Sequence, residues 1–474
     1  MRARIVALSV SLALGSALMA PAAVAVAEPS ASTILPVAEC KLTSPISRFN
    51  EGFVLDDDAA APKGTLTAQI IYADFPDNRG GAEGEFWLEH LRADTERAVA
   101  NLEAQAGGAL DVVVREHAEW VTLPHETTSY PESGDAAWGS RVFFEFVTDA
   151  VAAADPVVDF AGADVVWVFY PWIAPLAARA QAENFIPLSL DGDEVLRAIT
   201  LPKAGSDAAV APIIVHETGH TFGLPDLYDS VSPGGTSSHL GSWDPMSDGW
   251  GDGHELEAWE FMGWHLWRLG WIRDDQVTCV GSSPRVDVTL DALTRRGSSA
   301  IVVIPTSDHR AVVVESRKAE RYDASIIRPG VLITVVDTEV GSGEGPVRVG
   351  PRDGTEFPTN PEGFANSTLV VGDRYTDPVA GFTVSVIANT AASDTVRIEP
   401  ADAPTEPPID PDPDPAPPVD SPSTPAGAVA TLPPTGPDPT IGVLVSIVLL
   451  LAGAAGIGVA RTRSTSPERR STPN

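Results

Sequence analysis

The segment that most constrains this chain covers residues 212–224 and reads PIIVHETGHTFGL. Its opening residues are apolar, so a helix formed here must bury at least one face. His216 and His220 stand four residues apart, which places both imidazoles on the same face of a helix, one turn apart. Glu217 follows on the adjoining face. The segment therefore predicts a buried helix that offers one metal ion two imidazole ligands, with a carboxylate beside them.

The residues after this helix complete the pattern. Gly223 predicts the end of the helix, because glycine tolerates the left-handed conformation at a C-terminal cap. A sharp turn there would bring Asp226 back as a third ligand and leave one tetrahedral position for water. Glu217 could then take a proton from that water and pass it to a leaving amine. In a competing arrangement, the third ligand is an acidic residue further downstream. The candidates are Glu255, Glu257 and Glu260.

Further stretches carry a family resemblance. Met246 lies in a turn-like segment, GSWDPMS, downstream of the helix. Together with ADFPD at 73–77, HETGHTFGLPDLYD at 216–229 and the stretch 259–272 that closes with LGWI, this segment resembles the immune-inhibitor-A family of secreted zinc metallopeptidases, in the metzincin-like group. The resemblance spans residues 64–275 and, more loosely, the region that follows.

The resemblance implies a Zn²⁺ site and hydrolysis of peptide bonds in extracellular proteins. The implied zinc ligands are His216, His220 and Asp226. Glu217 would be the catalytic general base and acid, and Met246 the methionine that underlies the metal. Family members commonly bind Ca²⁺ as well, for which residues 191–194 (DGDE) are the candidate. The other histidines are expected to be satisfied or exposed rather than ligands. These include His90, His117, His125, His239, His265 and His309.

A rival interpretation is a surface adhesin that retains the protease fold as a binding module. The intact Glu217 argues against it, because a pure binder needs no base.

Strand-like and helix-like patterns alternate over residues 64–275, which is typical of an α/β layer domain. The expected strands are 65–75, 110–123 and 163–172, and the expected helices are 85–105 and 140–154. Residues 276–399 instead contain short strands separated by Gly, Pro, Asp and Ser, as in an all-β sandwich. We therefore expect an α/β metzincin-like zinc peptidase domain followed by an all-β sandwich-like domain.

The N-terminus has the features of a secretory signal. Residues 1–27 begin with two arginines, continue as an apolar run and end in Ala-Val-Ala, a small-residue cleavage site. An uncleaved membrane anchor is the alternative. The N-terminal segment that remains, 28–63, is shorter than the propeptide often found in the family. Export permits disulfides, and the chain's two cysteines, Cys40 and Cys279, are predicted to bridge. The alternative is a free Cys40 thiolate that caps the zinc as a latency switch.

The C-terminus combines three features in order. Residues 432–436 read LPPTG, residues 441–460 form an uncharged apolar span long enough for a transmembrane helix, and four arginines follow. This order resembles the cell-wall sorting signal of Gram-positive surface proteins, here 432–474. It implies that a sortase cleaves between Thr435 and Gly436 and joins Thr435 to peptidoglycan. A plain single-pass anchor is the alternative.

Residues 400–431 are rich in Pro and Asp and cannot bury a core, so they predict a disordered stalk. In polyproline II conformation it would extend on the order of 100 Å and span the wall. The formal net charge of −34 would repel polyphosphates, so nucleic acid is not expected as a partner. The sequence thus predicts a secreted zinc endopeptidase anchored to the peptidoglycan of a Gram-positive bacterium.

Overall fold

The computed structural model describes residues 34–401, except 81–84, 131–139, 172–179, 187, 191–192, 196, 203–209, 230–238, 248–258, 282–284 and 359. The signal peptide, nearly all of the stalk, and the sorting signal with Thr435, Gly436 and the span 441–460 lie outside the described residues. Among the residues that are described, no helix is both long and apolar enough to span a membrane.

The first part of the chain builds a mostly parallel five-stranded sheet. Its strands, in spatial order, are β2 (Leu110–Thr122), β1 (Gly64–Asp74), β3 (Val165–Tyr170), β7 (Ala198–Pro202) and β4 (Gln181–Glu183). Only β4 runs antiparallel, at the edge beside β7. The central strands β1 and β3 are largely buried on both faces, as their continuous apolar runs require. A separate hairpin pairs β5 (Leu188–Leu190) with β6 (Asp193–Val195).

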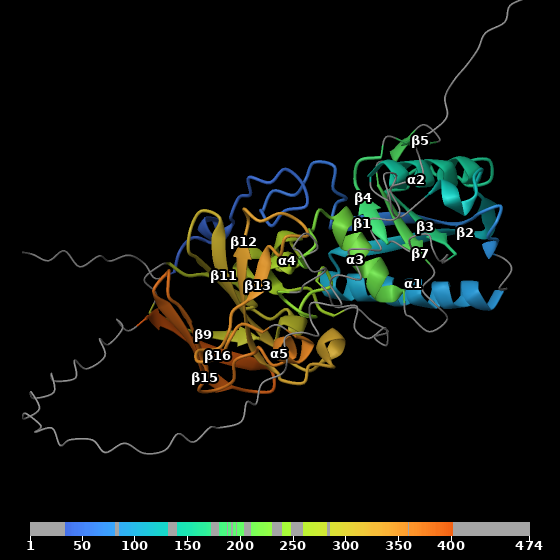
Figure 1. Ribbon diagram of the computed structural model, residues 1–474. Helices are drawn as coiled ribbons and strands as arrows, with labels where there is room; N and C mark the ends of the chain where they lie inside the picture. The colour runs from blue at the N-terminus through green and yellow to red at the C-terminus, as the bar shows by residue number, and fades with distance from the viewer. Residues whose placement is uncertain are drawn as a thin grey trace, which may run out of the picture. The chain divides into compact units, whose positions relative to one another are not determined.

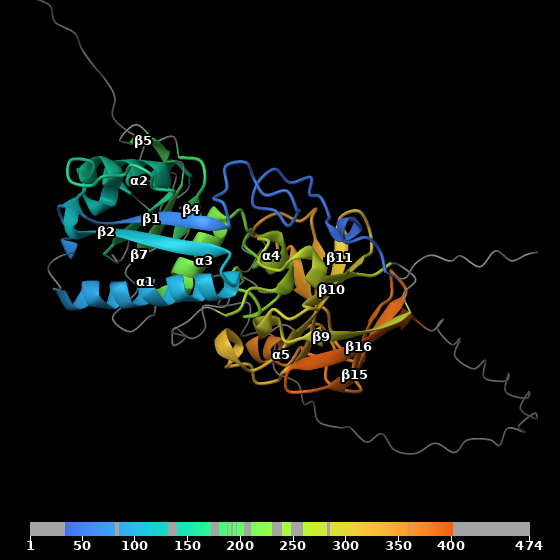
Figure 2. The ribbon, with the colours of Figure 1, turned by 180° about the vertical axis from the view of Figure 1, so that it is seen from behind.

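Helices cover both faces of this sheet. α1 (Glu85–Ala106) and α3 (Ala211–Thr221) share one core with alternate residues of β1 and β3. α2 (Ser140–Ala154) packs on the opposite face, and both views show α1 and α2 on either side of the sheet (Figures 1 and 2). The expected helices and the three expected strands are confirmed to within two residues at each end, which gives the predicted α/β layers.

The second part of the chain is all β apart from short helices. One sheet has the order β13 (Val347–Val349), β12 (Gly330–Asp337), β11 (Arg310–Arg317), β10 (Ile301–Pro305) and β8 (Val277–Cys279). The other has the order β14 (Arg374–Asp377), β15 (Phe382–Asn389), β16 (Ser393–Pro400) and β9 (Val286–Asp291). Alternate side chains of the two sheets form one shared core, as expected of packed sheets.

Short helices connect these elements. Two are α-helical, α4 (Gly263–Arg268) and α5 (Pro361–Ala365). The 3₁₀ helices are η1 (Val37–Cys40), η3 (Thr127–Ser129), η4 (Asp274–Gln276), η5 (Leu293–Arg295) and η6 (Arg321–Asp323).

A single hydrophobic core joins the α/β part to the β part. The second face of the β10–β11–β12 sheet contributes Ile301, Val313 and Leu332 to the same buried cluster as Trp264 of α4 and Ile214 of α3. The described residues accordingly belong to one compact unit. The limits of the two domains stay predictions, but the described parts of both share this core.

The N-terminal segment is covalently tied into this unit. Cys40 and Cys279 form a disulfide with their Cα atoms 5.9 Å apart, which confirms the predicted bridge. Cys40 is therefore not a free thiolate, and the alternative of a zinc-capping switch at this residue is wrong.

Candidate metal centre

Helix α3 carries the predicted motif and is buried along most of its length. Pro212 lies in its first turn, where a missing N–H is harmless, and the Asp94 carboxylate of α1 accepts the Val210 N–H just before it. At the other end, Gly223 adopts a φ of 85°, and Leu224 N donates to Gly219 O at 3.1 Å. This pattern closes a helix through a left-handed residue. The predicted helix end at Gly223 is confirmed.

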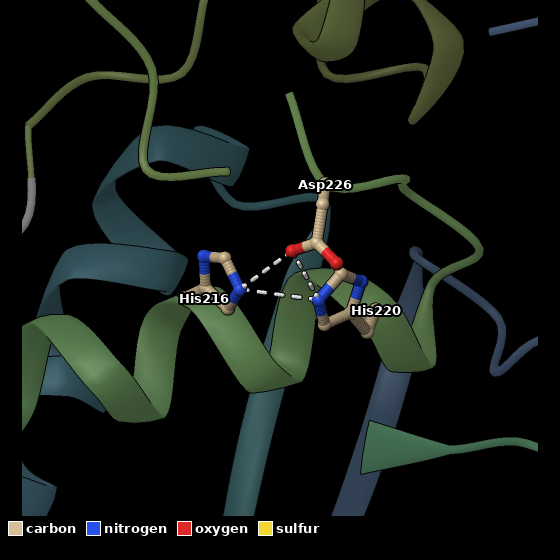
Figure 3. Close-up of side chains that lie close together, drawn as sticks. All are labelled: His216, His220 and Asp226. Carbon is tan, nitrogen blue, oxygen red and sulfur yellow. Dashed lines mark hydrogen bonds and ion pairs between the residues drawn. The ribbon is translucent and has the colours of Figure 1, made fainter. Parts of the chain in front are cut away.

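Three candidate ligand atoms converge at this helix (Figure 3). Nε2 of His216 and Nε2 of His220 lie 3.1 Å apart, and Oδ1 of Asp226 lies 3.2 Å and 3.1 Å from them. Metal–ligand bonds of about 2.0–2.1 Å in a tetrahedron would separate ligand atoms by roughly 3.3 Å. The three side chains therefore have the spacing that one small cation requires.

The outer hydrogen bonds of the two imidazoles decide which nitrogen faces the site. Nδ1 of His216 lies 2.8 Å from Pro245 O, and Nδ1 of His220 lies 2.8 Å from Leu224 O. A carbonyl oxygen only accepts, so each Nδ1 carries the proton and each Nε2 of a neutral ring presents a lone pair. Two lone pairs and a carboxylate oxygen then face one another. Such a set of acceptors needs a cation or a proton between them, which a metal ion would supply.

The charge balance shows the same need. Burial alone would lower the pKa of His220, but the Asp226 carboxylate beside it prevails and raises the pKa to about 9. Burial alone would raise the pKa of Asp226, but His220 and His216 hold it far below its usual range. Asp226 is therefore ionised and demands a neighbouring positive charge.

Glu217 lies next to these ligands, and its carboxylate is buried with them. It is buried, with 3% of its surface exposed, and burial raises the pKa of its carboxyl. Its Oε2 accepts no hydrogen bond from any residue that the structure describes. A buried carboxylate with an open oxygen is suited to receive a proton.

Met246 packs against the motif helix. It is fully buried, and a Cβ on Gly219 would collide with its Sδ. Only glycine at this point of α3 lets the Met246 turn approach so closely. The structure places Met246 beside the ligand helix, while its predicted role toward a metal stays a prediction.

Of the three glutamates that could instead supply the third ligand, the structure describes one, Glu260. Glu260 is buried and pairs with Arg296, and it does not belong to the ligand cluster. Glu255 and Glu257 lie outside the described residues. Of the calcium candidate 191–194, only Asp193 and Glu194 are described, in β6, so calcium stays a prediction.

The β part supplies a support for the site that the sequence did not suggest. Ser342 Oγ accepts the Asp226 N–H at 2.9 Å, and Gly343 N donates to Asp226 O at 3.1 Å. Both residues come from the connection between β12 and β13, more than a hundred residues downstream. No local signal marks them, because their role depends on how the second part packs on the first.

Comparison with known proteins adds little to this picture. No family model and no curated protein matches the chain. Among solved structures, two crystal structures of wild-type OgpA from Akkermansia muciniphila align with it at 10% and 11% identity and a TM-score of 0.26 each. The alignments cover 73% of this chain and 97% and 96% of the OgpA chains. A TM-score this low does not establish a common fold, so the family assignment depends on the motif residues alone.

Proposed function

We propose that this protein is a zinc-dependent endopeptidase of the immune-inhibitor-A type. The observation that carries the proposal is the convergence of His216, His220 and Asp226 within 3.2 Å of one another, beside the buried carboxylate of Glu217. Two imidazole nitrogens and one carboxylate oxygen form a donor set that suits Zn²⁺ and leaves a fourth position open.

The protein's own residues have separate tasks in this reaction. When bound, zinc would act as a Lewis acid toward a peptide carbonyl and would acidify a water molecule. His216 and His220 are held in the ligating tautomer by the carbonyls of Pro245 and Leu224. Glu217 takes the proton of the attacking water on its open oxygen and delivers it to the nitrogen of the leaving amine. The peptide bond breaks, and water is consumed.

A binding module that only retains the fold is the less favoured alternative. Burying a carboxylate oxygen without a hydrogen-bond partner is costly, and a binder gains nothing from Oε2 of Glu217 in that state. A proton shuttle, by contrast, needs this open oxygen.

Replacement of Glu217 tests the proposal. Glu217→Gln should lower casein cleavage by at least about 100-fold, because it removes the general base while the ligands stay in place. Zinc content, measured by mass spectrometry after dialysis, should stay at the wild-type value. Loss of zinc together with activity would contradict the assigned role, and a metal-free, inactive wild-type protein would contradict the proposed function.

The proposed setting is the wall of a Gram-positive bacterium, with extracellular proteins as substrates and a sortase as the transient partner. The signal sequence at 1–27 and the ordered sorting features at 432–474 support it. The wild-type protein should sediment with peptidoglycan, and muralytic enzymes should release it. Thr435→Ala should divert it to the membrane or the medium. Unchanged wall attachment of that variant would leave the plain membrane anchor.

A further inference from the structure

We propose that Glu51 of the N-terminal segment is a positioning residue for the metal ligands, acting through His265 and Asp244. The inference depends on the proposed function, because it concerns the ligands assigned to zinc. It also makes the N-terminal segment a permanent part of the working protein rather than a removable propeptide. Three structural steps lead from Glu51 to the ligands, and a fourth anchors Glu51 itself.

The first step is a histidine held between two carboxylates. His265 Nε2 lies 3.0 Å from Glu51 Oε1, and His265 Nδ1 lies 2.9 Å from Asp244 Oδ2. All three side chains have no exposed surface. Carboxylates in this cluster accept, so both ring nitrogens donate and His265 is an imidazolium. Its charge links two segments that lie far apart in the sequence.

The second step runs from Asp244 to the methionine turn. Asp244 Oδ1 accepts the Met246 N–H at 2.7 Å, and Asp244 Oδ2 accepts the Met262 N–H at 2.8 Å. The Ser247 N–H also donates to Asp244 O at 3.0 Å. The carboxylate of Asp244 therefore holds Met246, and its backbone carbonyl closes the turn at Ser247.

The third step connects this turn to two of the three ligands. Pro245 O accepts the Nδ1–H of His216 at 2.8 Å. Met246 O accepts the Leu227 N–H at 2.9 Å, directly after Asp226. A shift of the turn would therefore move a ligand on α3 and the ligand that follows α3 at the same time.

The fourth step anchors Glu51 itself. Arg268 donates to Glu51 Oε2 at 3.4 Å and to Gly52 O at 2.7 Å, and Trp264 Nε1 donates to Glu51 O at 3.2 Å. Two residues before Glu51, Phe49 has a φ of 45°. The centroid of its ring lies 5.7 Å from that of His220, in an edge-on contact. Removal of this segment would leave His265 and Arg268 buried without their carboxylate.

The charges of the cluster explain why Glu51 matters at a distance. Glu51 and Asp244 carry two negative charges, and His265 and Arg268 carry two positive charges, so the buried group is neutral. Glu51→Gln would leave an excess positive charge, and His265 would then tend to release a proton. A neutral imidazole with its proton on Nδ1 would still donate to Asp244, but without the positive charge this hydrogen bond would be weaker, and the turn would be held less firmly.

The test measures zinc affinity in the full-length exported protein. Glu51→Gln should weaken zinc binding on the order of 10-fold, the lower part of the range for partners outside the first ligand shell. The Co²⁺-substituted variant should also show an altered visible absorption spectrum, because the ligand geometry changes. The matched control is Asp394→Asn. Asp394, in β16, is also a buried carboxylate, and it pairs at 2.7 Å with Lys318, which follows β11. It should lose thermal stability without a change in zinc affinity or spectrum.

Each outcome supports or overturns the positioning role of Glu51. Wild-type zinc affinity and an unchanged Co²⁺ spectrum in Glu51→Gln would overturn the positioning role, whatever the loss of stability. Should that variant fail to fold, Glu51→Asp keeps the charge but shortens the side chain, and unchanged affinity there would overturn the role as well. A wild-type protein that binds zinc and cleaves casein, with Glu51→Gln indistinguishable from it, refutes only this inference. A wild-type protein that binds no zinc refutes both the inference and the proposed function.

Discussion

Two buried clusters in this protein combine histidine with carboxylate, and they differ in what the imidazole nitrogens face. In the candidate metal centre, Nδ1 of His216 and Nδ1 of His220 meet backbone carbonyls, so the opposite nitrogens face Asp226. In the second cluster, both nitrogens of His265 meet carboxylates. A carbonyl partner keeps a proton on Nδ1 and leaves Nε2 to meet either a proton or a metal ion, whereas two carboxylate partners occupy both nitrogens of the ring. The hydrogen-bond partners of a buried histidine therefore distinguish a candidate metal ligand from a histidine whose charge is structural.

The largest effect is expected when the carboxylate of the metal centre is removed, which tests Asp226 as the third ligand. Asp226→Ala should weaken zinc binding by more than about 100-fold, since loss of even an outer partner costs about 10- to 100-fold. The zinc content after dialysis, measured by mass spectrometry, checks this. Glu260→Gln is the control and should retain zinc, because Glu260 is paired with Arg296. Full occupancy in Asp226→Ala, with loss on replacing Glu255, Glu257 or Glu260, would place the third ligand downstream.

A second experiment tests the charge of His265. Burial alone would lower the pKa of His265, but Asp244 and Glu51 raise it to about 9. Because the folded-state pKa exceeds the unfolded value of about 6.5, the stabilisation is fully present below pH 6.5 and is lost as the pH rises through about 9. The free energy of unfolding should fall by on the order of 3 kcal/mol over this interval.

Urea unfolding of a His220→Ala variant measures this fall without the other histidine whose pKa is raised. An NMR titration of the His265 ring can assign the fall in stability to this residue. Constant or rising stability between pH 6.5 and 9 would show that His265 is neutral, and the contrast between the two clusters would disappear.

The smallest expected effect tests the contact between Gly219 of α3 and Met246, which connects the two clusters. Gly219→Ala should destabilise the protein by about 1–3 kcal/mol through collision with Met246, although alanine alone would favour the helix. Zinc affinity should fall in parallel, because the displaced turn carries the Pro245 carbonyl that holds His216. Gly281→Ala, whose Cβ would meet Leu35 at ordinary contact distance, is the control for thermal unfolding. A Gly219→Ala variant as stable as wild type would contradict the close packing of Met246 on α3.

Much of the α/β part could be predicted because its signals are local. The buried stripe of α2 and the apolar runs of β1 and β3 follow from periodicity within one element. The short strands β4 and β7 were not expected. β4 is only three residues long and pairs with β7 at the sheet edge, so no periodic pattern can develop in it.

The sequence by itself determined the ligand helix, since the spacing of His216 and His220 and the stop at Gly223 all act within a few turns of backbone. It also fixed which cysteines could pair, because the chain has only two, while the structure showed that they do. Only the tertiary structure decided which carbonyls orient the imidazoles, and that His265 is a buried cation rather than an ordinary histidine. The contact between Glu51 and His265 joins residues 214 positions apart. Such a contact forms only when separate elements pack, because no local periodicity relates residues at that distance.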